Sequence, residues 1–248
     1  MATPVLYIFA ISHYCEKARW ALDYLNIEYR LQHLSPVSYG KFVRSLGVAD
    51  TSLPVLVTNS LVLQGSSRII DWATKQDKAG TSGLQTDIDS SVGREIEQRL
   101  DDVFGVHVRR YFYSEALFDQ PRAVRRIFAT DLRWPQKILL RFAWSKICKY
   151  MIRGMDLGVE QGLESRQIID TELDWLDGLL ARDRPYLLGE QFSRTDLVAA
   201  SLLSPLALPA QHPAYHELQI PPGVAADLAA WRERPSLRWV RDVYRQYR

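Results

Sequence analysis

The chain has 248 residues, of which 47% are hydrophobic and 24% are charged, a composition that suits one large or two modest globular domains. Its formal net charge of +2 gives no reason to invoke nucleic acid as a partner. The two cysteines, Cys15 and Cys148, lie far apart and make neither a disulfide framework nor a metal cluster, so we expect no metal and no cofactor.

The N-terminus shows no targeting segment. Residues 1–4 lead directly into an apolar run without the basic residues that open a signal peptide. No apolar run approaches the roughly 18 residues of a membrane span. Even residues 138–152 are interrupted by Arg141, Lys146 and Lys149. The sequence therefore predicts a cytoplasmic protein without a membrane span.

The first predicted element is a strand over Val5–Ile11, where a continuous apolar run suits burial on both faces. A helix over Glu16–Asn26 follows, with Ser12 at its N-cap, where the hydroxyl satisfies a free backbone N–H. Because a helix N-terminus stabilises nearby negative charge, a thiolate or carboxylate has a physical reason to be held there.

Strands and helices alternate up to about Thr74, which predicts a sheet with helices packed against it. Further strands are expected around Glu28–Leu34, at 54–57 and at 61–64, followed by a helix. The stretch Lys75–Ser91 lacks any apolar period and is interpreted as a linker.

The remainder is predicted to be almost entirely helical, because apolar residues recur at helical spacing over 96–108 and 168–180. Ser193 with Asp196 forms a capping box before Leu197, which gives Asp196 a structural role. The predicted fold class is therefore α/β plus all-α, with a sheet domain over residues 1–76 and a helical domain over 90–248.

Four motifs, taken in order, resemble those of the cytosolic glutathione S-transferase family, in its serine-type, bacterial-like form. They are Ser12-His13-Tyr14-Cys15, Leu53-Pro54, Leu61–Ile70 and the capping segment Phe192–Leu197. The resemblance covers nearly the whole chain and is weakest between about residues 105 and 165. It implies an N-terminal thioredoxin-like domain that binds glutathione and a C-terminal helical-bundle domain that holds the co-substrate.

The resemblance also implies roles for individual residues. Ser12 would be catalytic, its hydroxyl donating one hydrogen bond to the glutathione thiolate; lowering the thiol's pKa by two units would correspond to about 2.7 kcal/mol. A cis bond before Pro54 would present the Leu53 backbone to the peptide, although a trans proline opening an edge strand stays open. Tyr14 would line the site, unless it packs within the apolar stripe of its helix.

Ser66 and Ser67 are expected to bind the γ-glutamyl carboxylate of glutathione together with free N–H groups at a helix start. Ser67 matches the serine of the family. Ser66 stands where the family usually has an acidic residue or glutamine, so the ligand's ammonium loses one counter-charge. The alternative for both residues is an ordinary serine cap.

Two other residues remain candidates as the partner of the thiol. Many members of the family use a tyrosine from the end of the first strand, but alternation along the strand points Tyr7 to the opposite face. Cys15 would support a glutathione-dependent thiol reductase. It falls, however, at the more buried second position of the turn, where a cysteine usually behaves as a small apolar residue.

The segment Pro121–Arg153 carries nine cations against Asp131 alone. It is either a site for an anionic substrate or acidic partner, or a solvated helix face balanced by the acidic stretch Glu160–Asp177; charge runs are usually solvated, which favours the second. The segment is longer than the family's usual connection between helices, so a distinctive pocket or an interface is expected there. Aromatic residues that could form an apolar pocket opposite Ser12, of which only one or two should contact substrate, are Phe104, Tyr111, Phe112, Tyr113, Trp134 and Trp144.

The function that the resemblance implies is transfer of glutathione, as a co-substrate, onto a small electrophilic apolar molecule in detoxification. A homodimer is expected, in which Asp101 and Asp102 could reach the neighbouring subunit's site. Two alternatives remain: a non-enzymatic interaction protein of the same fold, and the reductase that uses Cys15. The departure at Ser66 and the unusual middle segment support the interaction protein.

Overall fold

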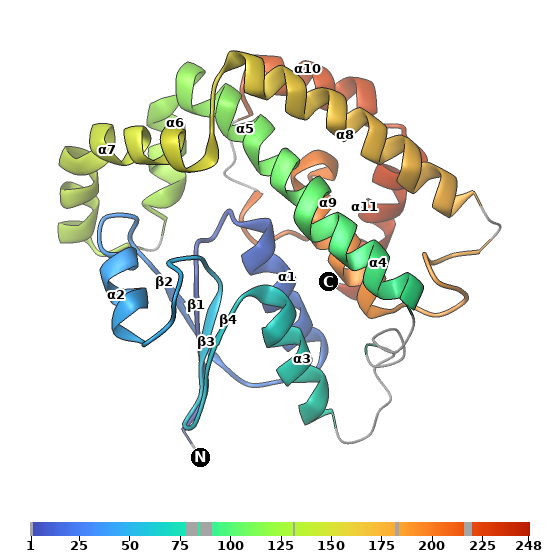
Figure 1. Ribbon diagram of the computed structural model, residues 1–248, viewed down its shortest axis with the longest axis horizontal. Helices are drawn as coiled ribbons and strands as arrows, with labels where there is room; N and C mark the ends of the chain where they lie inside the picture. The colour runs from blue at the N-terminus through green and yellow to red at the C-terminus, as the bar shows by residue number, and fades with distance from the viewer. Residues whose placement is uncertain (1, 78–83, 85–90, 131, 182–183, 216–219) are drawn as a thin grey trace.

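The computed structural model describes the whole chain except residues 1, 78–83, 85–90, 131, 182–183 and 216–219. A small sheet domain, built from the N-terminal third, packs against a larger helical domain (Figure 1). The first domain contains β1 (Val5–Ile8), α1 (His13–Tyr24), β2 (Arg30–His33), α2 (Tyr39–Ser45), β3 (Val55–Val57), β4 (Val62–Gln64) and α3 (Ser66–Gln76). The second contains α4 (Ser91–Arg99), η1 (Leu100–Phe104), α5 (Gly105–Asp119), α6 (Pro121–Phe128), α7 (Trp134–Met155), α8 (Val159–Leu180), α9 (Arg194–Ala207), α10 (Pro222–Trp231) and α11 (Pro235–Tyr247).

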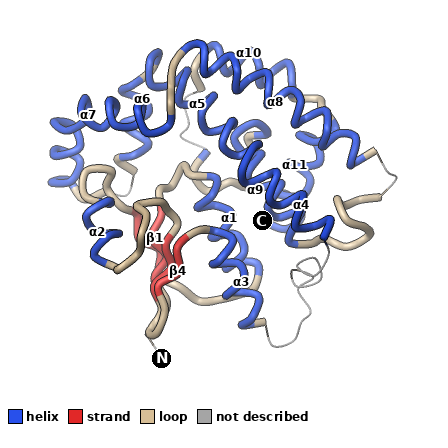
Figure 2. The backbone as a smooth tube through the Cα atoms, viewed as in Figure 1, coloured by secondary structure: helices blue, strands red, loops and turns tan. Residues whose placement is uncertain are grey.

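The sheet has the strand order β2-β1-β3-β4, with β1 parallel to β2 and the other two pairs antiparallel. Helices α1 and α3 lie on one side of it and α2 on the other (Figure 2). This βαβαββα order is thioredoxin-like, and the predicted fold class is confirmed. Most of the predicted linker, Lys75–Ser91, lies outside the described residues.

The first strand is shorter than predicted and is not uniformly buried. β1 ends at Ile8, because its pairing with β2 stops there, and the next residues turn away from the sheet. Leu6 and Ile8 are buried against α1 and α3, whereas Tyr7 is half-buried on the opposite face, with its ring 4.8 Å from that of Phe42 in α2. The apolar run therefore reflects one core face and one face covered by a short helix.

The two domains meet closely where η1 joins α5. η1 is π-helical, so the Gly105 N–H donates to the Leu100 carbonyl, one residue farther back than in an α-helix. At this point the Tyr14 hydroxyl of α1 donates to the Asp101 carbonyl at 2.6 Å. A Cβ added at Gly105 would lie 2.7 Å from the Tyr14 hydroxyl oxygen, so only glycine permits this approach.

Three apolar clusters form the core. The largest fills the helical domain and includes Trp20 and Ile70 from the sheet domain, so the domain boundary is itself a packed core. The second lies between the sheet and its two covering helices. The third is smaller and joins α6 and α7 through Phe128, Leu140 and Trp144.

The predicted capping box at the start of α9 is confirmed. Asp196 is fully buried and accepts hydrogen bonds from the Ser193 N–H at 2.9 Å and the Leu187 N–H at 2.8 Å. The carboxylate thus ties the helix start to the preceding loop, which is the structural role that the sequence indicated.

Candidate functional site

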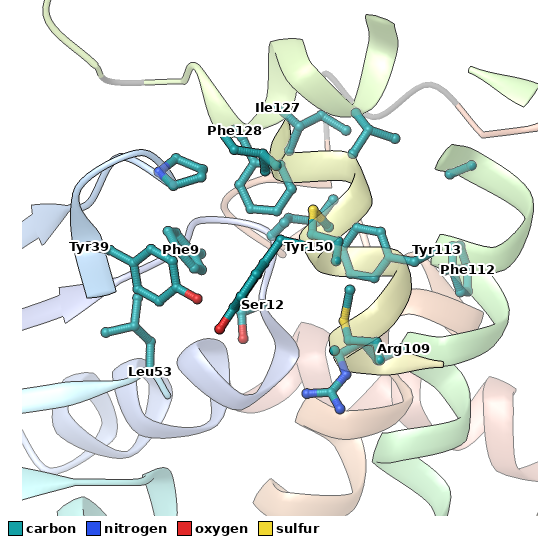
Figure 3. A pocket seen from close by; sticks show the side chains of 18 of the residues that line it. Phe9, Ser12, Tyr39, Leu53, Arg109, Phe112, Tyr113, Ile127, Phe128 and Tyr150 are labelled. Carbon is teal, nitrogen blue, oxygen red and sulfur yellow. The ribbon is translucent and has the colours of Figure 1, made fainter. Parts of the chain in front are cut away.

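A cavity of about 1030 Å³ opens between the two domains. Its walls come from the segment after β1, from α2 and the loop before β3, and from α5, α6 and α7 (Figure 3). Ser12, Tyr14 and Leu53 line it, whereas Pro54, Ser66 and Ser67 do not. The structure therefore brings three of the six predicted site residues to one cavity.

The lining of the cavity is apolar and positively charged. Aromatic and aliphatic side chains such as Phe9, Phe112, Tyr113 and Phe128 make up much of it. No aspartate or glutamate lies among the described residues that line it, which leave out residues 131 and 216–219. Six cations do, which favours an amphipathic anion as the ligand; they are Lys41, Arg44, Arg109, Lys146, Lys149 and Arg153.

Ser12 caps α1 and still has a proton to donate. Its backbone is extended, and its Oγ accepts from the Cys15 N–H at 3.3 Å, which is the predicted N-cap bond. Because the oxygen serves as the acceptor in this bond, the hydroxyl hydrogen remains available to a ligand in the cavity.

His13 and Tyr14 anchor the start of α1 to the helical domain. His13 is buried with its Nε2 3.1 Å from the Gly105 carbonyl, and burial lowers its pKa to about 3, with help from the nearby Arg109. Burial also raises the pKa of Tyr14 well above its usual range. Both side chains are therefore neutral at physiological pH, and Tyr14 contributes its ring rather than its hydroxyl to the cavity.

The buried histidines predict a loss of stability in acid. Burial lowers the pKa of His212 to about 3 as well. The unfolded chain binds a proton at each site below about pH 6.5 and the folded chain does not, so stability falls as the pH decreases, by about 2 kcal/mol per histidine at pH 5. Denaturant titrations at pH 7.5 and 5 should show this loss and a shallower one in a His13→Gln/His212→Gln variant. Equal pH dependence in both proteins would contradict it.

The alternative thiol partners lie outside the cavity lining. Tyr7 faces α2, as strand alternation predicted. Cys15 is fully buried, and burial raises the pKa of its thiol to about 11. A thiol that is neither accessible nor ionised is a poor nucleophile, and this environment favours the structural interpretation of Cys15.

Leu53 lies in the turn before β3 and lines the cavity. The Leu53–Pro54 bond is cis, as predicted. The Gln64 side chain holds this turn by donating to the carbonyls of Asp50 at 2.9 Å and Ser52 at 3.0 Å. A second restraint comes from Gly65, whose N–H donates to the Pro54 carbonyl at 3.0 Å.

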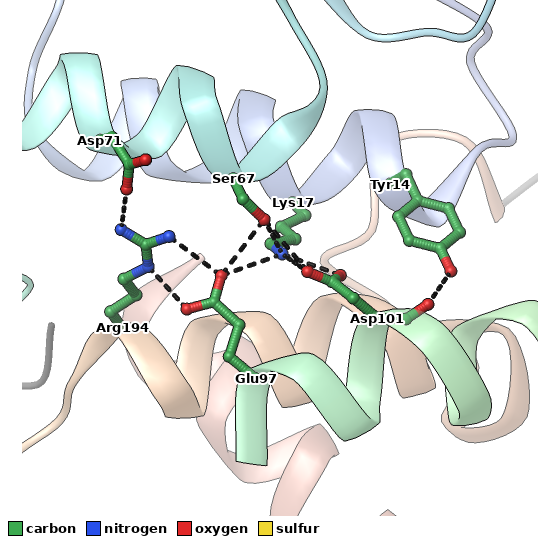
Figure 4. Close-up of polar contacts among 7 residues, drawn as sticks. All are labelled: Tyr14, Lys17, Ser67, Asp71, Glu97, Asp101 and Arg194. Carbon is green, nitrogen blue, oxygen red and sulfur yellow. Dashed lines mark hydrogen bonds and ion pairs between the residues drawn. The ribbon is translucent and has the colours of Figure 1, made fainter. Parts of the chain in front are cut away.

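Ser67 belongs to a polar network between the domains (Figure 4). Its hydroxyl oxygen lies 3.0 Å from Lys17 Nζ, 3.0 Å from an Asp101 carboxylate oxygen and 3.3 Å from Glu97. Ser66 is buried at the first turn of α3, after Gly65, which adopts a φ of 94° at the N-cap. The predicted serine pair thus lies at a helix start, but Ser67 already has charged partners.

Lys17 is the centre of this network and is fully buried. Its ammonium contacts Glu97 at 3.2 Å and Asp101 at 2.7 Å, and Arg194 binds the other side of Glu97. Although burial alone would raise the pKa of Glu97, Lys17 and Arg194 hold it below its usual range. Asp101, considered above as a group that could reach a neighbouring subunit, therefore pairs within its own chain.

Arg109 is the functional candidate that the sequence did not reveal. It lines the cavity close to Ser12 (Figure 3), and its positive charge disfavours protonation of the neighbouring His13. Its Nε is buried, with no hydrogen-bond partner in the described part of the chain. An unpaired guanidinium at this position can stabilise an anion bound beside Ser12.

The aromatic candidates separate into three groups. Phe112 and Tyr113 line the cavity, so they are the two of the six that are placed to contact a substrate there. Trp134 is exposed on α7. The others, which serve the core rather than the cavity, are Phe104, Tyr111 and Trp144.

The acidic stretch of α8 does not balance the basic segment, which corrects the favoured interpretation. Its carboxylates pair instead with Arg166 of the same helix and with three arginines of other helices, Arg99, Arg110 and Arg234. None of the nine cations of Pro121–Arg153 forms an ion pair within the described residues, which omit Asp131.

Comparison with known proteins identifies the first domain by sequence and the whole chain by fold. The family model for the glutathione S-transferase N-terminal domain matches residues 6–80. A glutathione S-transferase from Sinorhizobium meliloti 1021 is 21% identical with a TM-score of 0.52, covering 96% of this chain and 92% of its own. Gtt2 from Saccharomyces cerevisiae is 19% identical with a TM-score of 0.58, and the match covers 95% of this chain and 99% of Gtt2.

A theta class glutathione S-transferase from Xanthomonas axonopodis pv. citri, solved with glutathione bound, is 17% identical with a TM-score of 0.52, covering 96% of both chains. Comparison with curated protein sequences gave no match. The solved structures agree with the two-domain architecture, and the matched N-terminal domain carries the motifs at Ser12, Leu53 and Ser67. The N-terminal domain is therefore a glutathione S-transferase N-terminal domain by sequence, and the whole chain has the fold of the glutathione S-transferases.

Proposed function

We propose that this protein is a glutathione transferase, which adds the glutathione sulfur to an electrophilic carbon of an apolar co-substrate or substitutes it there. The observation that carries the proposal is the hydroxyl of Ser12 at an α-helix N-terminus, on the wall of a cavity whose described lining residues include six cations and no acid. Glutathione is an anion, and its thiolate adds a further negative charge.

Three features would stabilise the thiolate. The Ser12 hydroxyl donates a hydrogen bond, the N-terminus of α1 contributes its partial positive charge, and the Arg109 guanidinium of α5 lines the same cavity. The thiol of free cysteine has a pKa of roughly 8.5, so a shift of about two units makes the thiolate the main form at neutral pH.

The peptide and the electrophile would occupy different walls. The Leu53 backbone pairs with the cysteinyl unit as one strand pairs with another. The apolar walls of α5 and α6, including Phe112 and Phe128, hold the electrophile beside the sulfur. Proximity then supplies much of the rate acceleration.

Calorimetry with glutathione, together with turnover of a generic aryl halide, tests this function. We expect heat of association at millimolar glutathione and formation of the thioether product. Cys15→Ala should retain turnover, because the buried thiol takes no part in transfer. Loss of turnover in Cys15→Ala, with folding intact, would instead support the thiol reductase.

The surroundings of Ser67 favour a second candidate, an interaction protein without activity. A γ-glutamyl carboxylate approaching Ser67 would meet the carboxylates of Glu97 and Asp101, although Lys17 offsets part of their charge. Absence of both heat and turnover with glutathione would support this candidate over the transferase.

A further inference from the structure

Helix α7 exposes large apolar side chains on its outer face. Trp134 is 73% exposed, Phe142 81%, Leu139 53% and Ile138 45%. The positions 134, 138 and 142 follow one another at four-residue spacing and therefore share one side of the helix. The opposite side packs inward, where Leu140 and Trp144 belong to the small core with α6. The exposed side chains therefore belong to the side of α7 that faces away from this core.

The same outer face is cationic. No acidic residue occurs in Trp134–Met155, and its lysines and arginines are exposed without an ion pair in the described part of the chain. Lys146, Lys149 and Arg153 line the cavity, whereas Arg133, Lys137 and Arg141 do not. We call the combined surface of Trp134, Ile138, Leu139, Phe142 and these last three cations the α7 outer face.

The combination of charges and aromatic groups indicates what binds there. A helix face that only contacts water would not carry Trp134 and Phe142, because exposed apolar patches mark interaction sites. Two copies that met through this face by two-fold symmetry would place cations against cations. Tryptophan, phenylalanine and leucine interspersed with lysine and arginine are typical of helices that lie in a membrane interface.

We propose that the α7 outer face binds the surface of a bilayer that contains anionic lipids. The face spans residues 133–142 and lies flat for about 15 Å, with the apolar side chains entering the interface and the long cationic side chains reaching the lipid phosphates. Within the described residues, no helix is long and apolar enough to cross a membrane, so the attachment is peripheral. This inference does not depend on glutathione.

Co-sedimentation of the full chain with vesicles tests the proposal. We expect binding to vesicles of phosphatidylcholine mixed with phosphatidylglycerol, at least about tenfold weaker binding to phosphatidylcholine alone, and weakening by salt. Trp134→Ser/Phe142→Ser should weaken binding to the mixed vesicles at least about tenfold, because association scales with the apolar area that is buried. Lys137→Gln/Arg141→Gln should weaken it roughly tenfold through the lost charge.

A matched control comes from α8, where Val159 and Leu163 are also exposed at four-residue spacing, at 72% and 55%, but next to Glu160 and Glu164. Val159→Ser/Leu163→Ser should leave vesicle binding unchanged, and thermal melts should show all variants folded.

Failure of the wild-type protein to bind the mixed vesicles would overturn the proposal. Equal effects of the α7 and α8 variants would also overturn it. Binding to poly-glutamate but not to vesicles would assign the face to an acidic protein. An elution volume that Trp134→Ser/Phe142→Ser shifts, without vesicle binding, would assign it to self-association.

Discussion

Ser12→Ala is expected to lower kcat/KM for glutathione transfer about 100- to 1000-fold, the cost of removing one preorganised donor to a developing or bound anion. The backbone of α1 and the Arg109 charge would remain, so residual activity persists. The thiolate absorbance of bound glutathione, followed against pH, should show the pKa of its thiol moving upward in the variant.

The cap that Ser12 supplies to α1 requires its own control, because the Ser12→Ala variant loses a bond to the Cys15 N–H that is worth about 1 kcal/mol. Aspartate caps a helix as well as serine does but repels a thiolate. Ser12→Asp should therefore keep the thermal stability of the wild type and have still lower activity. Wild-type turnover in either variant would refute the assignment of Ser12 as the catalytic residue.

Lys17→Met is expected to destabilise the protein by about 3–5 kcal/mol, because it removes one partner of a buried ion-pair network and leaves carboxylates without compensation. Lys17 is fully buried, and the side chains of Glu97 and Asp101 are only 14% and 21% exposed. For a chain of this length, the loss corresponds to a decrease in Tm of roughly 10 °C.

Lys75 offers the matched control, since it is an exposed lysine on a neighbouring helix of the same domain. Lys75→Met should change Tm by no more than about 2 °C, as surface substitutions usually do. If Lys17→Met melts at the same temperature as Lys75→Met, the network does not hold the domains together.

Local sequence signals were sufficient for the features that depend on neighbouring residues. The cap at Ser12 and the capping box at Asp196 are confirmed, because each is decided within one helical turn. The cis bond at Leu53–Pro54 is also confirmed, but the resemblance to glutathione S-transferases, and not the local sequence, implied it. The order of strands and helices followed from hydrophobic period alone, whereas β1 ended early because pairing with β2 decides its length.

Features that depend on packing between domains could not be predicted. Lys17 lies in the sequence Glu16-Lys17-Ala18-Arg19, where it resembles any helix-surface lysine, and becomes buried only when the helical domain covers it. Arg109 and Arg110 are adjacent, yet one helical step turns Arg109 into the cavity and Arg110 towards Glu164. The sequence contains both arginines without indicating the rotation of the helix.

The basic segment shows a third limit. Sequence proximity suggested that the carboxylates of Glu160–Asp177 would neutralise it, but α8 packs along α5 and directs these groups to other arginines. Which charges meet is set by the packing of helices. The same reason explains why Trp144 is buried while Trp134, ten residues earlier on the same helix, is exposed.

The small core between α6 and α7 has a consequence for how this protein could diverge. Because it is separate from the two other cores, exchanges of bulk at Phe128, which also lines the cavity, can reshape one side of the cavity while the folding of either domain is preserved. The side of the cavity near Ser12 is held in place by the close contact between Tyr14 and Gly105. A lineage could therefore acquire new electrophiles through changes within residues 121–155, with the nucleophile's surroundings left as they were.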